Sequence, residues 1–165
     1  MDDFLSRSIA CLLPSAPPEG EDARLVREIG NGFMIAYAVD NDWVRQRHLS
    51  TGAATAADVH RQAMDNLFTL CAYHIRVQQF GAFFGVFIDG KFEASMFLLE
   101  RLWQKDFANL VEKGYAIAAP ARDVLAFCDI DSHEGKTELK RMIDRVWDGG
   151  DHLLSRELFR VRKKT

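Results

Sequence analysis

The fold class is decided by residues 75–90, which read I-R-V-Q-Q-F-G-A-F-F-G-V-F-I-D-G. Ile75 and Val77 alternate with polar residues, a glycine interrupts the pattern, and a second run rich in β-forming residues follows at 83–88. The dipeptide Asp89-Gly90, which ends that run, is typical of a tight turn between strands. The stretch therefore predicts two adjacent strands joined by a short turn.

Strands are expected in pairs elsewhere in the chain as well. The other predicted strands cover residues 33–39, 43–44, 115–119, 123–129 and about 157–162. Asp40-Asn41-Asp42 predicts a turn inside the first of these pairs, because Asp and Asn side chains bond their own backbone. Pro120 separates the second pair, and we expect it at a turn or an edge because proline cannot donate to a strand ladder.

Three segments show apolar residues at helical spacing. They cover about 56–73, 93–112 and 134–148, and each places one apolar stripe along a helix. Thr55 and Asp58 form a variant of the capping box before the first of these helices. We therefore expect three helices between the strand pairs.

The order of these elements indicates an α+β fold, in which about three helices pack on an antiparallel or mixed sheet built from paired strands. A parallel Rossmann sheet is not favoured, because its strands and helices would alternate singly. The 165 residues can bury about 70% of their unfolded surface, which is enough for one ordinary core. Residues 13–22 are rich in proline and acidic side chains. We therefore expect residues 1–32 to be an N-terminal segment with a Pro-rich linker, and residues 33–165 to be a single α+β domain.

Composition and charge exclude several classes of protein. Apolar residues make up 48% of the chain and charged residues 27%, with a net charge of −3, which excludes a disordered acidic tail, a collagen-like repeat and a strongly basic nucleic-acid arm. The longest apolar stretch, 80–88, is far shorter than the roughly 18–20 residues of a membrane helix. Three widely spaced cysteines outside any C-x-x-C pattern favour a reducing compartment. We expect a cytoplasmic protein that binds neither nucleic acid nor a membrane.

The segment before the last predicted helix contains two motifs that resemble ligand-binding sites but have simpler structural interpretations. Gly135-Lys136-Thr137 is not a phosphate-binding loop, because the glycine required five residues earlier is Ile130. Asp129, Asp131 and Glu134 could hold a divalent cation, but Asp131 with Glu134 also fits a capping box, and capping is the favoured interpretation. The histidines show no zinc-ligand spacing. We predict neither a metal nor a cofactor.

Five polar residues at strand ends and helix starts form the candidate ligand or partner site: Glu93, Arg122, Asp123, Asp129 and His152. Glu93 enters a helix from a hairpin and would act as a general base only in a buried setting. Arg122 stands at the mouth of a strand, where its guanidinium could hold a carboxylate ligand or lock a neighbouring aspartate, and the lock is favoured. We assign no catalytic residue, because no serine elbow or activated cysteine accompanies these groups.

With these segments identified, the chain resembles the YtpQ-like family of bacterial proteins, a group with a domain-of-unknown-function label. The resemblance covers roughly residues 33–159 and rests on the order and spacing of short motifs. These are Tyr37-Ala38-Val39-Asp40; Ala63 with Asp65-Asn66-Leu67; Asp89-Gly90 with Glu93-Ala94-Ser95 and Leu98-Leu99; Pro120 with Arg122-Asp123-Val124-Leu125 and Phe127; and Gly150-Asp151-His152 with Leu154-Ser155. The resemblance implies an intracellular bacterial α+β domain and carries over no activity, substrate or catalytic residue.

The leading functional hypothesis is a non-enzymatic protein-interaction module, such as an adaptor or an immunity-like protein. It rests on a well-formed predicted core, on aromatic residues expected at the surface such as Trp43 and Phe159, and on the lack of an assembled acid–base or nucleophile set in the sequence. The alternative is a small enzyme or ligand-binding domain whose site is formed by the five candidates named above. Convergence of Arg122, Asp129 and His152 in one pocket would favour that alternative. The sequence leaves the oligomeric state open.

Overall fold

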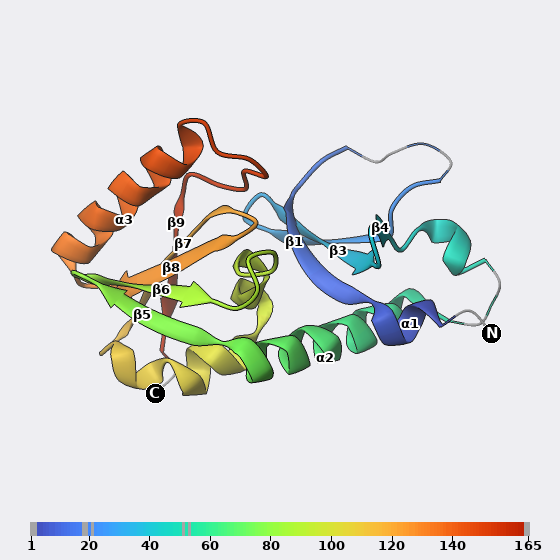
Figure 1. Cartoon of the computed structure of the whole chain (residues 1–165), viewed down its shortest axis with the longest axis horizontal. Coiled ribbons are helices and arrows are strands. Elements are labelled where there is room, and N and C mark those ends of the chain that lie inside the picture. The colour runs from blue at the N-terminus through green and yellow to red at the C-terminus, as the bar shows by residue number, and fades with distance from the viewer. Residues whose placement is uncertain (1–2, 18–19, 21, 51, 53, 164–165) are drawn as a thin grey trace. The chain divides into compact units, whose positions relative to one another are not determined.

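The computed structural model describes residues 3–17, 20, 22–50, 52 and 54–163. These residues form two compact units that divide between Tyr73 and His74, and each unit has its own antiparallel sheet (Figure 1). Helices accompany both sheets, so the predicted α+β class with paired antiparallel strands is confirmed.

The first unit, in its described residues, builds a sheet of order β1-β3-β2, and β4 also pairs with β3. The strands are β1 (Ile9–Pro14), β2 (Val26–Gly30), β3 (Phe33–Val39) and β4 (Asp42–Trp43), and the helical segments are α1 (Phe4–Arg7), the short turn η1 (Gln46–His48) and α2 (Ala56–His74). The predicted hairpin between β3 and β4 is confirmed. The predicted capping box before α2 is confirmed too, because the Thr55 N–H donates to Asp58 Oδ2 at 2.9 Å and the Asp58 N–H to Thr55 Oγ1 at 3.1 Å.

Strands β1 and β2 lie in the stretch expected to be an N-terminal segment and linker. β1 pairs along its whole length with β3, from Ile9 opposite Ala38 to Pro14 opposite Phe33. β2 is exposed at all five residues, so its sequence lacks the apolar alternation by which a half-buried strand is predicted. The expected boundary between residues 32 and 33 consequently falls inside the β2–β3 hairpin, and the compact units divide at residue 73 instead.

The second unit builds a five-stranded antiparallel sheet of order β5-β6-β8-β7-β9. The strands are β5 (Arg76–Phe80), β6 (Phe83–Phe87), β7 (Gly114–Ala121), β8 (Val124–Asp129) and β9 (Leu158–Arg162). The two predicted strand pairs of this unit and its final strand are confirmed. Pro120 is not at a turn or an edge, however, because it lies inside β7 at a register shift between Ala118 and Ala121. A bulge at that point removes the ladder bond that proline cannot make.

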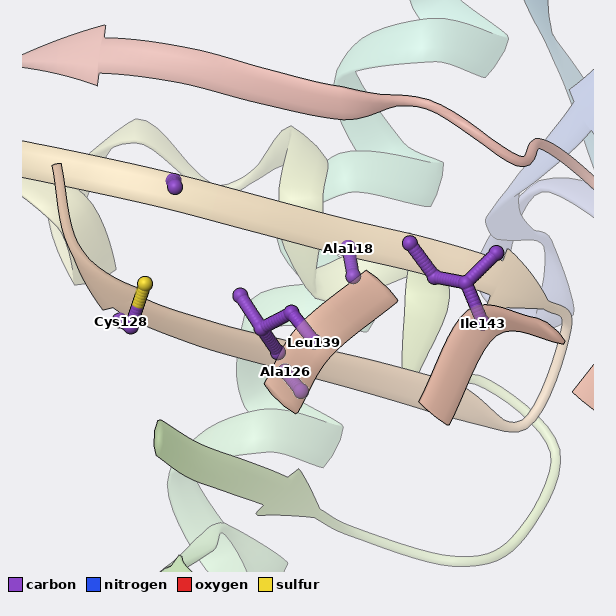
Figure 2. Close-up of a cluster of buried hydrophobic side chains, with 6 residues drawn as sticks. Ala118, Ala126, Cys128, Leu139 and Ile143 are labelled. Carbon is purple, nitrogen blue, oxygen red and sulfur yellow. The ribbon is translucent and has the colours of Figure 1, made fainter. Parts of the chain in front are cut away.

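Helix α3 (His133–Trp147) covers one face of this sheet, and its prediction is confirmed. Leu139 and Ile143 extend from α3 onto β7 and β8, as Figure 2 shows. The residues beneath them are small and buried: Ala116, Ala118, Ala126 and Cys128. Small residues on the strands leave space for the larger helix side chains, so this face packs as a continuous core.

The α-helix predicted over residues 93–112 is wrong as a continuous element. The segment forms the 3-10 turn η2 (Ala94–Leu98), the π-helical turn η3 (Leu102–Asp106) and the 3-10 turn η4 (Ala108–Leu110). Leu99 adopts an extended backbone, and the indole N–H of Trp103 donates to the carbonyl oxygens of Met96 at 3.3 Å and Phe97 at 3.2 Å. In a continuous α-helix those carbonyls would accept backbone N–H groups one turn later. The Met96 carbonyl also accepts the Leu99 N–H at 3.1 Å, so 3-10 bonding and the Trp103 indole together take the place of the α-helical bonds here.

An aromatic cluster covers the opposite face of the sheet. Tyr115 and Phe127 alternate along their strands with the small residues beneath α3, so they point to the other side. Trp103 meets Tyr115 edge-on with ring centroids 5.1 Å apart, and Phe107 stacks on Phe127 at 5.2 Å. The Tyr115 hydroxyl donates to the Trp103 carbonyl at 2.6 Å, and burial raises the pKa of Tyr115 to about 12. The turns η2 to η4 thereby provide the second cover of the sheet.

Candidate functional site

Four of the five candidate residues lie around the turn between β7 and β8. The Arg122 carbonyl accepts the N–H of Ala94, the residue after Glu93, at 3.1 Å. The Arg122 N–H donates to the carbonyl of His152 at 2.9 Å. Asp123 lies in the same turn and is exposed. The fold thus gathers these residues mainly through backbone hydrogen bonds.

Asp129 lies at the other end of the same hairpin. It stands opposite Tyr115, and its carboxylate accepts the N–H of Glu112 at 2.7 Å and that of Asp131 at 3.0 Å. Five residues of extended strand separate it from the β7–β8 turn, a span of roughly 17 Å. The five candidate residues therefore do not converge on one site, because Asp129 lies away from the other four.

Glu93 is buried, with 3% of its surface exposed. Its Oε2 accepts the N–H of Ile88 at 2.9 Å and that of Gly90 at 2.8 Å. Gly90 has a φ of +82°, which favours glycine, so the carboxylate holds together the turn that follows β6. The contacts of Oε2 give Glu93 a structural task at this turn.

Arg122 is less well paired than predicted. Its Nε and the Glu93 Oε1 are buried without a hydrogen-bond partner among the described residues. Among the described residues no ion pair joins Arg122 to an aspartate. The predicted ion pair that would lock a neighbouring aspartate in place is therefore not formed. The backbone of Arg122, rather than its guanidinium, makes the connections at this turn.

His152 and the cysteines offer no activated nucleophile or base. The His152 ring is half exposed, and its Nε2 lies 3.4 Å from Asp151 Oδ2. Cys11, Cys71 and Cys128 form no disulfide, and all three are buried. Burial raises the pKa of the Cys128 thiol to about 11, which keeps it protonated near neutral pH.

The acidic segment before α3 provides the cap at the start of this helix. Ser132, not Asp131, is the N-cap of α3, and its side chain accepts the Gly135 N–H at 2.9 Å. The predicted capping box of Asp131 with Glu134 is therefore wrong in its residues, although a cap does start the helix. Across the described residues, no cluster of three or more His, Cys, Asp or Glu side chains has a geometry that would hold a metal ion.

The aromatic residues expected at the surface are less exposed than predicted. Phe159 is only 8% exposed and meets Phe97 edge-on, with ring centroids 5.5 Å apart. Trp43 is partly buried, and the guanidinium of Arg24 lies 5.4 Å from its ring centroid. The prediction is wrong for Phe159, because β9 pairs with β7 and this side chain points into the core.

Exposed apolar side chains occur instead on β5, which is an edge strand. In the described chain β6 is the only strand paired with β5, and Figure 1 shows β5 in green as the outermost strand of its sheet. All five residues of β5 are exposed, with Val77 at 37% and Phe80 at 40%. Phe80 packs on its inner side against Phe83 and Phe87, with ring centroids 5.8 and 6.1 Å apart. Its outer side faces solvent.

A groove lies at the end of the hairpin where Arg76 of β5 pairs with Phe87 of β6. It has a volume of about 540 Å³ and is lined by Arg76, Val77, Gln78 and Phe87. Arg76 makes no hydrogen bond or ion pair through its side chain within the described residues. The sequence predicted this strand, but nothing in its pattern indicated that it would lie at the edge, because strand order is a property of the whole sheet.

The two edges of the sheet are protected differently. β9, at the far edge, carries exposed Arg160 and Arg162, and charged side chains on an edge strand discourage pairing with another chain. β5 has a single charge, at its first residue, and neither a proline nor a bulge. The β5 edge therefore lacks the usual devices against strand pairing.

Comparison of the chain with protein-family models, curated proteins and solved structures finds no significant match. The resemblance to the YtpQ-like family therefore stays a prediction. None of the helices in the described ranges combines the length and apolar character that crossing a bilayer requires.

Proposed function

We propose that this chain is a non-enzymatic protein-interaction module that binds an extended protein segment along the free edge of β5. The observation that carries the proposal is an edge strand whose five residues are all exposed and which lacks edge protection. Strand addition uses main-chain hydrogen bonds for affinity and side-chain contacts on alternate positions for specificity.

The backbone of β5 has the groups that such binding needs. Phe80 and Phe83 flank the two-residue turn between β5 and β6, and Gly81 in that turn has a φ of +60°. In a two-residue hairpin the flanking pair is hydrogen-bonded, and bonded pairs alternate with unbonded ones along the ladder. The backbone N–H and C=O groups of Val77 and Gln79 therefore face away from β6 and are free to pair with an added strand.

The alternative, a small enzyme or ligand-binding domain, has less support. Asp129 is about 17 Å along the sheet from the other candidates, and its carboxylate is bound to backbone N–H groups. Glu93 uses one carboxylate oxygen to hold a turn. The remaining candidates contribute no nucleophile or paired acid and base.

Proline substitution at Gln79 tests strand addition. Gln79→Pro removes an N–H that faces the free edge and leaves the bonds to β6 intact, since edge strands tolerate proline where the N–H faces solvent. Gln79→Ala is the matched control, because both variants lose the bond from the Gln79 side chain to the Gly81 carbonyl. Proteins captured from a cell lysate by tagged wild-type chain are compared with those captured by the two variants.

The proposal expects at least one captured protein, or a second copy of the chain, to bind wild type and Gln79→Ala equally and to be lost with Gln79→Pro. Thermal unfolding of the three proteins checks that they are equally folded. Binding partners that Gln79→Pro retains in full, or the absence of any proline-sensitive partner, would contradict strand addition at β5.

A further inference from the structure

We infer that the strand added to β5 is β5 of a second copy of this chain, so that the two sheets join into one continuous antiparallel sheet. The inference rests on the proposed function and names its partner. It places Gln78 of each copy opposite Gln78 of the other, Val77 opposite Gln79, and Arg76 opposite Phe80. A two-fold axis then passes between the two Gln78 residues, which makes the contact closed and self-complementary.

The backbone pattern permits this register, and full overlap of the two five-residue strands selects it. Val77 and Gln79 are the residues whose N–H and C=O groups face the free edge, and the register pairs each of them with the other in the second copy. Gln78 and the pair of Arg76 with Phe80 then occupy the unbonded positions of the ladder. All five residues of each β5 find a partner, and no residue overhangs.

The side chains complement each other in the same register. Arg76, Gln78 and Phe80 share one face of β5 because side chains alternate along a strand. Arg76 has no ion-pair partner among the described residues, and Phe80 is 40% exposed. Placed opposite each other, the guanidinium of one copy reaches the Phe80 ring of the second copy, and the contact occurs twice. The groove beside Arg76 and Phe87 gives these side chains space.

Charge is compatible with self-pairing in this register. Direct pairing of Arg76 with Arg76 would set like charges opposite each other, and the antiparallel register avoids it by placing the two arginines at opposite ends of the strand pair. Two five-residue strands bury less surface than a standard interface of about 1,600 Å², so the dimer is expected to be weak.

Cysteine cross-linking of the full chain tests the register. Gln78→Cys places two thiols in an unbonded antiparallel pair, where the Cα atoms are about 4.5 Å apart and a disulfide can form. Gln79→Cys is the matched control, because its thiols lie on diagonal positions about 8 Å apart, beyond the range of a disulfide. The native cysteines are all buried, so they contribute little background.

Under mild oxidation we expect Gln78→Cys to form a reducible covalent dimer at least tenfold faster than Gln79→Cys. Equal rates, or no dimer from Gln78→Cys, would overturn the inference. Arg76→Glu provides a second measurement that needs no cysteine. Its control is Arg160→Glu, which makes the same charge change on the far edge of the sheet.

Sedimentation velocity between about 10 μM and 1 mM covers the range expected for so small an interface. We expect Arg76→Glu to weaken self-association about tenfold, because two cation–π contacts are lost at once, and Arg160→Glu to leave it unchanged. A wild-type chain that stays monomeric throughout this range would overturn the inference.

The proposed function and the inference fail in different ways. A monomeric chain that still captures another protein in a proline-sensitive manner keeps strand addition and overturns self-pairing. If the chain is monomeric and no captured partner is lost with Gln79→Pro, both the proposed function and the self-pairing inference are overturned.

Discussion

The carboxylate of Glu138 in α3 accepts the backbone N–H of Ala82, in the turn between β5 and β6, with 2.9 Å between Oε2 and N. The two residues are 56 positions apart in the sequence. A Cβ atom at the adjacent Gly81 would lie 3.0 Å from both oxygens of that carboxylate. The helix therefore holds the hairpin that carries the exposed edge strand, and the hairpin sequence is adapted to it.

Glu138→Ala should lower the free energy of unfolding by about 1–2 kcal/mol, because the Ala82 N–H loses its charged acceptor. Glu138→Gln, which retains an acceptor oxygen, should lose less than half of that. Urea unfolding measures both, with the exposed Glu157→Ala as control. If Glu138→Ala matches the control within a few tenths of a kcal/mol, the hydrogen bond has no role in stability.

Glu93→Ala should cost about 3 kcal/mol, because a buried carboxylate that accepts two backbone N–H groups is removed and the Ile88 N–H is left without a partner. Asp123→Ala, in the exposed β7–β8 turn, is the control and should change stability by about 0.5 kcal/mol or less. Chemical denaturation of both variants gives the comparison. Similar small effects would show that Glu93 is dispensable for the fold and would reopen a functional role for it.

Leu139→Ala should cost about 2–5 kcal/mol, because the fully buried side chain fills the space between α3 and the small residues of β7 and β8. Leu110→Ala removes the same atoms from a residue that is 39% exposed and should cost about 1 kcal/mol or less. The difference between their urea midpoints is the measurement. A smaller loss for Leu139→Ala than for Leu110→Ala is incompatible with the core in Figure 2.

His60 should make the first unit less stable in acid. Burial, and secondarily the nearby charge of Arg27, lower the pKa of His60, and its Nδ1 lies 2.8 Å from the Tyr37 hydroxyl. A histidine with a lowered folded pKa binds fewer protons than in the unfolded chain, so its contribution is complete above the unfolded pKa of about 6.5 and is lost as the pH falls through the folded pKa.

The measurement compares the free energy of unfolding at about pH 7.5 and pH 5 for wild type and His60→Gln. Wild type should lose more stability on acidification than His60→Gln, which has no titrating group at this position. Equal losses in the two proteins would show that His60 titrates as it does in the unfolded chain.

The sequence pattern was sufficient for helix α3 and for the hairpin at residues 75–90. Helix α3 has one buried side, so its apolar period is visible in the sequence. The hairpin was predicted from two runs of β-forming residues with a glycine between them, although all five residues of β5 are exposed in the fold. The same reasoning failed for β2, whose five residues are all exposed. It also failed for residues 93–112, where a helical apolar period is present but the Trp103 indole takes the carbonyls that a helix would use.

Prediction from the sequence was also incomplete for the candidate site. Glu93, Arg122 and His152 are brought together by backbone bonds around the β7–β8 turn, as their positions at element ends suggested. Asp129 also lies at a strand end, but at the far end of β8, whose first residue follows Asp123. The predicted strand over residues 123–129 already placed Asp123 and Asp129 at its two ends, whereas the meeting of Glu93, Arg122 and His152 depends on contacts between distant segments.

The sequence by itself determined the α+β class, the paired strands of an antiparallel or mixed sheet and two long helices, because turn residues and apolar period act over a few neighbouring positions. Tertiary structure decided the order β5-β6-β8-β7-β9, and with it that β5 would be an unprotected edge. Strand order depends on contacts between segments as distant as Phe84 and Phe127. Such contacts leave no local signature, so the surface on which the proposed function rests became visible only in the folded chain.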